Sequence, residues 1–339
     1  MGRAVGLSWL RFFVGLLLSV GAVVGGVVWW LNHPLEITAA PGAQAADLSI
    51  EPGTSARGVS QAVADAGVGV NPALLYWWFR LSSQDRQIKA GSYEIEPGAT
   101  PRSLLQKLVR GEEALRAVTL VEGWTFVQVR DALLKAEHLK QDTQGLEPDL
   151  IMQKLGKSGV AAEGRFFPDT YTYAKGASDL AVLKRALRAM DRRLDAAWSQ
   201  RQSDTPLKSP EQALILASIV EKETGKGSDR PQIAGVFTNR MRIGMPLQTD
   251  PTVIYGMGAK FDGNLRKRDL QTDTPWNTYT RRGLPPTPIA MPGKSALLAA
   301  VQPAQTKALY FVARGDGSSQ FSATLDEHNR AVNKFQRGQ

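Results

Sequence analysis

Two apolar stretches stand out in the pattern of hydrophobic and polar positions along this chain of 339 residues. The first runs from Phe12 to Leu31, FFVGLLLSVGAVVGGVVWWL, and contains no charge. A helix of this length spans ~30 Å, which is the thickness of a bilayer's hydrocarbon core. We therefore predict a transmembrane helix over residues 12–31, preceded by an N-terminal segment at 1–11 and followed by a linker at 32–47.

The residues that flank this first stretch indicate its orientation. Arg3 and Arg11 precede it, and Trp29 and Trp30 lie at its far end, where an interfacial aromatic belt is expected. The positive-inside rule then leaves residues 1–11 in the cytoplasm and the body outside, in a single-pass protein of the inner (cytoplasmic) membrane. A cleaved signal peptide is the alternative. The run is longer than a usual signal h-region, and no small-x-small cleavage site follows it directly, which favours a retained anchor.

The second stretch, SPEQALILASIVEKET at residues 209–224, predicts a buried helix. Ser209 is a suitable N-cap, Pro210 fits the first helical position, and Gln212 completes a capping-box pattern. From position 213 to 220 every residue except Ser218 is apolar, so we expect protein on all sides of this helix.

Two carboxylates, Glu221 and Glu223, stand at the C-terminal end of this helix. At ~100° per residue their side chains point roughly 200° apart, so one pocket holds only one of them. Glu223 continues the stripe formed by Ile219 and Val220, whereas Glu221 lies over Ser218. Glu223 is therefore the better candidate for a carboxyl group in a desolvated site.

The remaining patterns predict an α+β protein. Strand–turn–helix units with Pro-Gly turns indicate a small α/β subdomain at 48–113, and a mixed α+β domain that contains the buried helix follows at 114–335. Within that domain we expect a helix at 228–242, an extended, turn-rich segment at 245–258, a helix that begins near 294 and a closing β-hairpin.

The composition limits which residue types can carry out catalysis. The chain has no cysteine, and its three histidines show no metal-ligand spacing, so we expect neither a metal nor a cofactor. The net charge is +9, but the basic residues are dispersed and the predicted body lies outside the cytoplasm, so we expect no nucleic-acid partner. Carboxylates remain as the carriers of chemistry.

A buried Glu at a helix C-terminus suits proton transfer. Desolvation and the negative end of the helix dipole both raise its pKa, as a general acid for a glycosidic oxygen requires. The structural alternative is a Glu that pairs with a nearby Lys or Arg. The pattern alone leaves both interpretations open.

Several motifs closely resemble the YceG-like family of endolytic murein transglycosylases. They are ASIVEKET at 217–224, VFTNRMRIGMPLQTDPTVIYGMG at 236–258, NTYT at 277–280, GLPP at 283–286 and IAMPG at 289–293, with LVEG at 120–123 and EGRFFPDTY at 163–171. The resemblance covers roughly residues 48–335.

The resemblance implies an organisation and an activity. It implies a LysM-like subdomain over residues 48–113 and a catalytic domain over residues 114–335. The implied reaction is non-hydrolytic cleavage between N-acetylmuramic acid and N-acetylglucosamine within nascent peptidoglycan strands, which leaves 1,6-anhydro-N-acetylmuramic acid ends and terminates glycan elongation. The implied partners are glycan strands and glycan-polymerising synthases, and no cofactor is implied.

The resemblance also assigns roles to residues. Glu223 best matches the family's catalytic glutamate, with Glu221 as its structural neighbour. Glu223 would protonate the leaving oxygen and then accept the proton of the muramoyl C6 hydroxyl as that hydroxyl attacks C1. The candidates for holding the sugar are Gln248, Thr249, Asp250, Asn277 and Tyr279. Two alternatives remain: a non-catalytic peptidoglycan-binding or scaffolding protein, and a hydrolase in which Asp250 acts as a second carboxylate.

Overall fold

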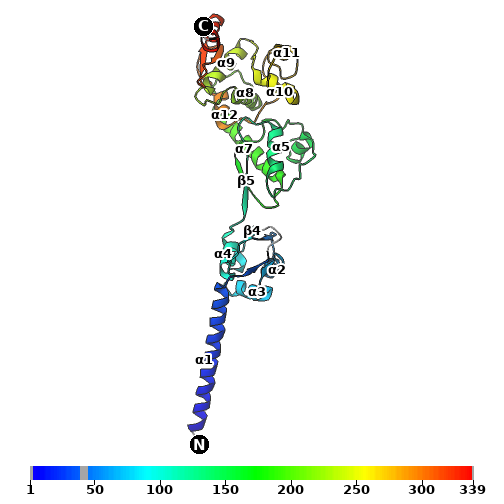
Figure 1. Cartoon of the computed structure of the whole chain (residues 1–339). Coiled ribbons are helices and arrows are strands. Elements are labelled where there is room, and N and C mark those ends of the chain that lie inside the picture. Colours follow the sequence, from blue (N-terminus) through cyan, green and yellow to red (C-terminus); the bar gives the residue numbers. More distant parts are fainter. Residues whose placement is uncertain (1–2, 39–44, 338–339) are drawn as a thin grey trace. The chain divides into compact units, whose positions relative to one another are not determined.

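The computed structural model describes residues 3–38 and 45–337, and the chain divides into two compact units, residues 1–116 and 117–339 (Figure 1). Residues 39–44 of the predicted linker and residues 1–2 of the predicted cytoplasmic segment lie outside the described residues. Helices and short strands alternate along the described chain, which confirms the expected mixture of the two. The LysM-like assignment of residues 48–113 stays a prediction.

Helix α1 (Arg3–Asn32) contains the first apolar stretch. Its segment Phe13–Asn32 has a mean hydropathy of 2.1, and within the described chain it is the one helix long and apolar enough to cross a membrane. The side chains from Phe13 to Val28 are exposed. The helix is therefore compatible with the predicted span.

The rest of the first unit packs helices against short antiparallel strands. Strand β2 pairs with β4, with Leu48 opposite Tyr93, and strand β1 pairs with β3, with Glu36 opposite Gly69. The elements are β1 (Glu36–Ile37), β2 (Ala46–Ile50), α2 (Ala56–Asp65), β3 (Val68–Gly69), α3 (Pro72–Leu81), a 3₁₀ turn (Asp85–Gln87), β4 (Gly91–Ile95) and α4 (Pro101–Arg110).

Side-chain caps begin the helices of this unit. Asn71 accepts the N–H groups of Ala73 and Leu74 at the start of α3, and Thr100 forms a reciprocal capping box with Ser103 at the start of α4. Alternate residues of β2 and β4 point inward, and with the inner faces of α2, α3 and α4 they form one apolar core.

The second unit is mainly helical. Strand β5 crosses the boundary between the units and pairs with β6, and β7 pairs with β8 in the predicted closing hairpin. The elements are β5 (Leu115–Thr119), α5 (Phe126–Lys135), α6 (Pro148–Lys154), β6 (Thr170–Ala174), α7 (Asp179–Ser199), α8 (Pro210–Glu223), α9 (Arg230–Arg242), α10 (Asp250–Met257), a 3₁₀ turn (Gly258–Lys260), α11 (Lys267–Gln271), α12 (Lys294–Val301), β7 (Tyr310–Ala313), β8 (Ser319–Ser322), α13 (Leu325–Val332) and a π turn (Asn333–Arg337).

Helix α8 lies at the centre of the second unit, in contact with α7, α9, α10 and α12 (Figure 1). Every residue from Ala213 to Glu221 is buried, as the apolar run predicts. Ser209 caps the helix by accepting the Gln212 N–H, but the Gln212 side chain bonds Lys208 N–H and leaves the capping box incomplete. The buried hydroxyl of Ser218 donates to Ile215 O and accepts the Ile289 N–H, so its polarity is satisfied inside the core.

The expectation of an extended segment at 245–258 is wrong for its second half, which forms α10. Pro251 occupies the first turn, where its missing N–H costs no hydrogen bond, and Asp250 lies at the positive end of the helix dipole. The helix has only eight residues. Proline and glycine at its two ends therefore give a sequence that is typical of a loop.

Candidate active site

Glu223 is the last residue of α8, and its carboxyl group is half-buried beside Thr249. The Thr249 hydroxyl donates a hydrogen bond to Glu223 Oε1. Burial raises the pKa of Glu223 to about 7, the nearby negative charge of Asp250 raises it as well, and the Thr249 hydroxyl and the positive charge of Arg240 offset part of the shift. A carboxyl with this pKa holds a proton on a large fraction of molecules at neutral pH, as a general acid must.

Thr249 is held by a network of buried threonines that joins two of the family-like motifs. Its N–H donates to Thr278 Oγ1 at 3.1 Å, and the hydroxyls of Thr252 and Thr278 lie 2.9 Å apart. Thr252 also donates to Thr249 O at 2.7 Å. Because the two buried hydroxyls of Thr252 and Thr278 hold the backbone of Thr249, its own hydroxyl meets Glu223 in a defined geometry.

Gln248 adopts a left-handed backbone conformation, with φ at 48°, and its N–H donates to Thr278 O at 3.1 Å. Residues other than glycine rarely adopt this conformation, and it costs free energy that surrounding contacts must offset. The side chain of Gln248 is exposed immediately before Thr249. It is therefore available to a ligand beside Glu223.

Asp250 and Tyr279 form a second polar pair. The Tyr279 hydroxyl donates to Asp250 Oδ1 at 2.6 Å. Partial burial raises the pKa of Tyr279, and so do the hydrogen bond to Asp250 and the negative charges of Asp250 and Glu223. Asp250 itself is exposed, and its charge acts on Glu223.

Asn277 is 0 % exposed and, like Thr249, differs in this from the predicted sugar-binding residues Gln248, Asp250 and Tyr279. Its amide nitrogen donates to Leu270 O at 3.0 Å and to Thr272 O at 2.7 Å, and its Oδ1 accepts the Tyr279 N–H at 2.8 Å. These bonds hold the loop that carries Tyr279. In this structure Asn277 therefore positions neighbouring residues and presents no surface to a ligand.

Glu221 lies in different surroundings from Glu223. It is buried, forms an ion pair with Arg230 at 2.5 Å, and accepts the Gly293 N–H at 2.9 Å. Burial raises the pKa of Glu221, and the Gly293 N–H and the Arg230 charge offset part of that effect. This carboxylate joins α8 to α9 and to the start of α12, which suits a structural role.

Two buried charged residues of the second unit were not identified as candidates from the sequence. Arg240 of α9 is buried and donates to Leu247 O at 2.5 Å and to Leu309 O at 2.7 Å. Burial lowers the pKa of Arg240, while the negative charge of Glu223 raises it. Arg240 follows the buried residues Ile233 and Val236 by seven and four positions, so a charge on the core face of the helix was a usable signal.

The second missed residue is Glu163, which is buried within the motif EGRFFPDTY. It accepts the Phe126 N–H at the start of α5 at 3.1 Å and the Tyr255 hydroxyl of α10 at 3.2 Å. Burial raises the pKa of Glu163 to about 7. The only signal in the sequence was a Glu inside a motif that otherwise reads as a packed aromatic turn.

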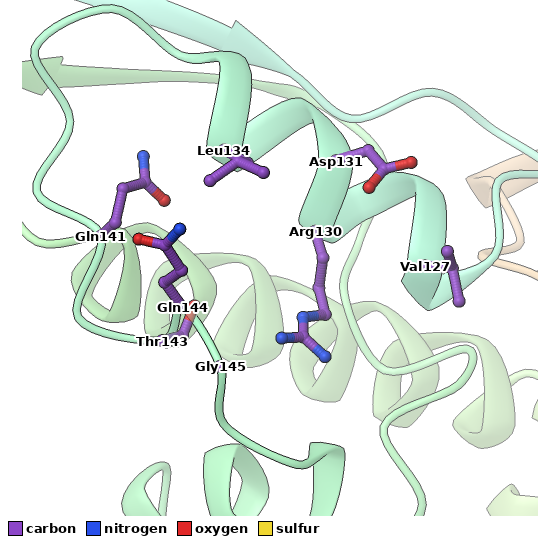
Figure 2. Close-up of a pocket in the computed structure, with 8 residues that line it drawn as sticks. All are labelled: Val127, Arg130, Asp131, Leu134, Gln141, Thr143, Gln144 and Gly145. Atoms are coloured by element: carbon purple, nitrogen blue, oxygen red, sulfur yellow. The ribbon is translucent and has the colours of Figure 1, made fainter.

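One concavity of the second unit does not include Glu223 in its lining. It has a volume of about 290 Å³ and lies between α5 and the loop at 141–145, where the Arg130 side chain extends between the two (Figure 2). A larger, more open one of about 610 Å³ lies on the Glu221 side, with Arg230 and Lys294 in its lining. Among the described residues, no group of three or more His, Cys, Asp or Glu side chains is placed to hold a metal ion.

Comparison with known proteins identifies the family to which this chain belongs. Residues 48–334 match the model of the YceG-like family. An endolytic murein transglycosylase of Bacillus subtilis is 33 % identical to this chain, and the alignment covers 73 % of each protein. One of Streptococcus pneumoniae is 28 % identical over 97 % of this chain and 65 % of its own length.

Comparison with a solved structure also points to the YceG-like family. The crystal structure of a yceG-like protein from Listeria monocytogenes is 28 % identical, with a TM-score of 0.54, and the match covers 85 % of this chain and 98 % of that one. The chain therefore belongs to the YceG-like family, and the resemblance seen in its motifs is confirmed.

Proposed function

We propose that this protein is a membrane-anchored lytic transglycosylase that cleaves peptidoglycan within its glycan strands. The observation that carries the proposal is the half-buried carboxyl of Glu223, whose pKa is raised to about 7, within a motif of the YceG-like family. The relatives named endolytic murein transglycosylase support the reaction class. The bond cleaved is the one between N-acetylmuramic acid and N-acetylglucosamine in nascent strands.

The proposed mechanism needs one carboxyl group. Protonated Glu223 donates its proton to the glycosidic oxygen as the bond to C1 breaks. The C6 hydroxyl of the same muramoyl residue then attacks C1, and the Glu223 carboxylate accepts the hydroxyl proton, which closes the 1,6-anhydro ring. Because the nucleophile is already part of the sugar, no second carboxylate has to activate water.

The neighbouring groups take supporting roles in this proposal. Thr249 holds the Glu223 carboxyl and favours its ionised form, which assists donation of the Glu223 proton to the glycosidic oxygen. Asp250 and Tyr279, which interact electrostatically with Glu223, and Gln248, which directly precedes Thr249, offer hydrogen-bonding groups to the sugar in this proposal. Asn277 acts by holding the Tyr279 loop.

The proposed location follows from α1. This helix anchors the protein in the inner membrane, with residues 1–11 in the cytoplasm and the body outside, where nascent glycan strands are made. Cleavage there terminates strand elongation, next to the synthases that polymerise glycan. The uncharged segment Phe13–Asn32 supports the anchor.

The test compares Glu223→Gln with Glu221→Gln on purified peptidoglycan, with products identified by mass spectrometry. We expect Glu223→Gln to lower the release of anhydro-ended glycans by at least ~100-fold while thermal stability stays unchanged, because the amide cannot donate a carboxyl proton.

The matched variant Glu221→Gln should behave in the opposite way. It removes the charge that faces Arg230, so we expect a lower Tm and retained cleavage by the folded fraction. Anhydro products from Glu223→Gln at the wild-type rate would contradict the assignment of the acid.

A two-carboxylate hydrolase is the second candidate, because Asp250 is close enough to raise the pKa of Glu223. A hydrolase would leave reducing ends in place of anhydro ends, so the same mass spectra distinguish the two enzymes. Glycan binding without any cleavage would instead indicate a peptidoglycan-binding or scaffolding protein.

A further inference from the structure

Helix α3 of the first unit exposes large apolar side chains along one face. Leu74, Trp77 and Leu81 are 55 %, 58 % and 78 % exposed. Their i, i+3, i+7 spacing places them on one side of the helix. Among the other large apolar side chains exposed beyond α1 in the described chain, at most two share a helix, Val127 and Leu134 of α5, whereas α3 exposes three. A contiguous apolar surface of this kind marks an interaction site.

The opposite face of α3 already supplies the core of the unit. Leu75 and Phe79 are 0 % exposed and pack in the cluster formed by the strands and the neighbouring helices. The helix is therefore apolar on two sides, and only one side is covered by protein. An amphipathic helix needs one apolar face, so the second face requires a separate explanation.

The chain connects this helix closely to the end of α1. Only residues 33–35 separate Asn32 from β1, and a fully extended segment of that length spans ~10 Å. Strand β1 pairs with β3 through Glu36 and Gly69, and α3 begins three residues later at Pro72. Leu31 is buried, and the Leu35 N–H donates to Ala99 O at 2.8 Å, so this connection packs against the unit.

We propose that α3 lies in the membrane–water interface, with Leu74, Trp77 and Leu81 in contact with lipid. The proposal rests on the anchoring role of α1 given above, because an α1 that spans the bilayer holds the first unit at its surface. Tryptophan and leucine are the residues that interfacial helices bury in the boundary between headgroups and acyl chains. Such docking would fix the orientation of the first unit against the bilayer.

The absence of cysteine from the chain allows a direct test with the full-length protein in lipid vesicles. Single cysteines replace Leu74, Leu81, Glu112 or Val24, and each carries a nitroxide label. Collision with oxygen, which concentrates in lipid, is compared with collision with a water-soluble nickel chelate. Glu112 is the water-exposed control. It follows the C-terminal end of α4, whereas the N-terminal end of α4 lies next to Ala99, whose carbonyl accepts the Leu35 N–H near the end of α1.

We expect the labels at 74 and 81 to lose nickel accessibility relative to the label at 112 and to approach the label at 24 in oxygen accessibility. Trp77→Asp should restore nickel access at 81, because a carboxylate opposes insertion. Leu115→Asp, which changes an exposed leucine elsewhere in the unit, should not restore it.

The label in α1 separates the two proposals. Nickel access at 74 and 81 equal to that at 112, with position 24 protected, would overturn interfacial docking and leave the anchor intact. Nickel access at position 24 would contradict the anchor itself.

Discussion

The pKa of Glu223 is set by groups that act in opposite directions. Burial and the charge of Asp250 disfavour the carboxylate, whereas the Thr249 hydroxyl and the Arg240 charge favour it. A group that donates a proton and then accepts one works best when its pKa lies near the working pH. The balance among these neighbours therefore matters for both halves of the proposed reaction.

This balance predicts opposite pH shifts for two variants. If Glu223 must be protonated to act, kcat/KM falls as the pH rises through about 7. Thr249→Val removes a hydrogen bond to the carboxylate, so the pKa rises and the alkaline limb moves up by about one pH unit. Asp250→Asn removes a nearby negative charge, so the limb moves down. The measurement is the pH profile of kcat/KM for anhydro-product formation.

The opposite directions of the two pH shifts serve as the control for Thr249→Val and Asp250→Asn. General damage to the site would lower both rates without moving the limb. A shift of both variants in the same direction would mean that another group, such as Glu163, titrates in this pH range.

For single residues, the sequence was informative wherever the direction of a side chain depends on one helix alone. Helical periodicity separated Glu221 from Glu223, and the structure places them in different surroundings. The partner of Glu223 is 26 residues further on, and only the resemblance pointed to Thr249. Arg240 and Glu163 were missed because their surroundings come from segments far apart in the chain. The burial of Asn277 was not visible for the same reason.

At the scale of helices and loops, side chains in the C-terminal half of α8 hydrogen-bond to backbone groups of the family-like motifs. Ser218 accepts the Ile289 N–H at 3.0 Å, Glu221 accepts the Gly293 N–H at 2.9 Å, and Lys222 donates to Gly123 O at 3.2 Å. These bonds join the motifs IAMPG and LVEG to the helix that carries Glu223. The segment at 288–293 therefore supports the position of the proposed acid.

Gly164 provides a test of that support. Its φ is 78°, and an added Cβ would lie 2.4 Å from Pro288 Cβ. Gly164→Ala must therefore displace the proline ring or the aromatic turn, in addition to straining the backbone. We expect it to lower the free energy of unfolding by about 1–3 kcal/mol more than backbone strain alone, as measured by urea denaturation.

Gly159→Ala is the matched control, because Gly159 has a φ of 75° and no atom within 4 Å of an added Cβ. The difference between the two variants isolates the contact with Pro288. Equal losses of stability would show that the packing of the turn against residues 288–290 contributes nothing.

The helices were predictable where caps and periodicity agree. Ser209 caps α8 as predicted, because capping depends on neighbours within one turn, and Asn71 and Thr100 cap α3 and α4 in the same way. Helix α10 was read as extended, since Pro251 and the glycines near its end are also typical of loops. Its conformation depends on packing against α8, which local sequence does not show.

At the scale of the molecule, each unit has its own apolar core. Among the described residues the first unit holds one cluster and the second holds two. Both clusters of the second unit include residues of α7, and one of them also includes α8. The alternation of predicted strands and helices predicted the class of fold and a boundary near residue 114, but no pattern showed that the second unit would hold two clusters. That division depends on contacts between distant segments.

Separate cores predict that residues 114–339 fold without the first unit. This fragment retains β5, which pairs with β6, and loses the ion pair between Arg116 and Glu94. That pair is partly exposed, so its loss costs at most about 1 kcal/mol.

We expect the fragment 114–339 to show one cooperative thermal transition by circular dichroism, and to cleave purified peptidoglycan in a reaction that Glu223→Gln abolishes. The fragment should not bind lipid vesicles, because α1 and α3 are both absent. An unfolded fragment would mean that the second unit requires the first, and a folded but inactive one would extend the proposed site beyond the residues around Glu223.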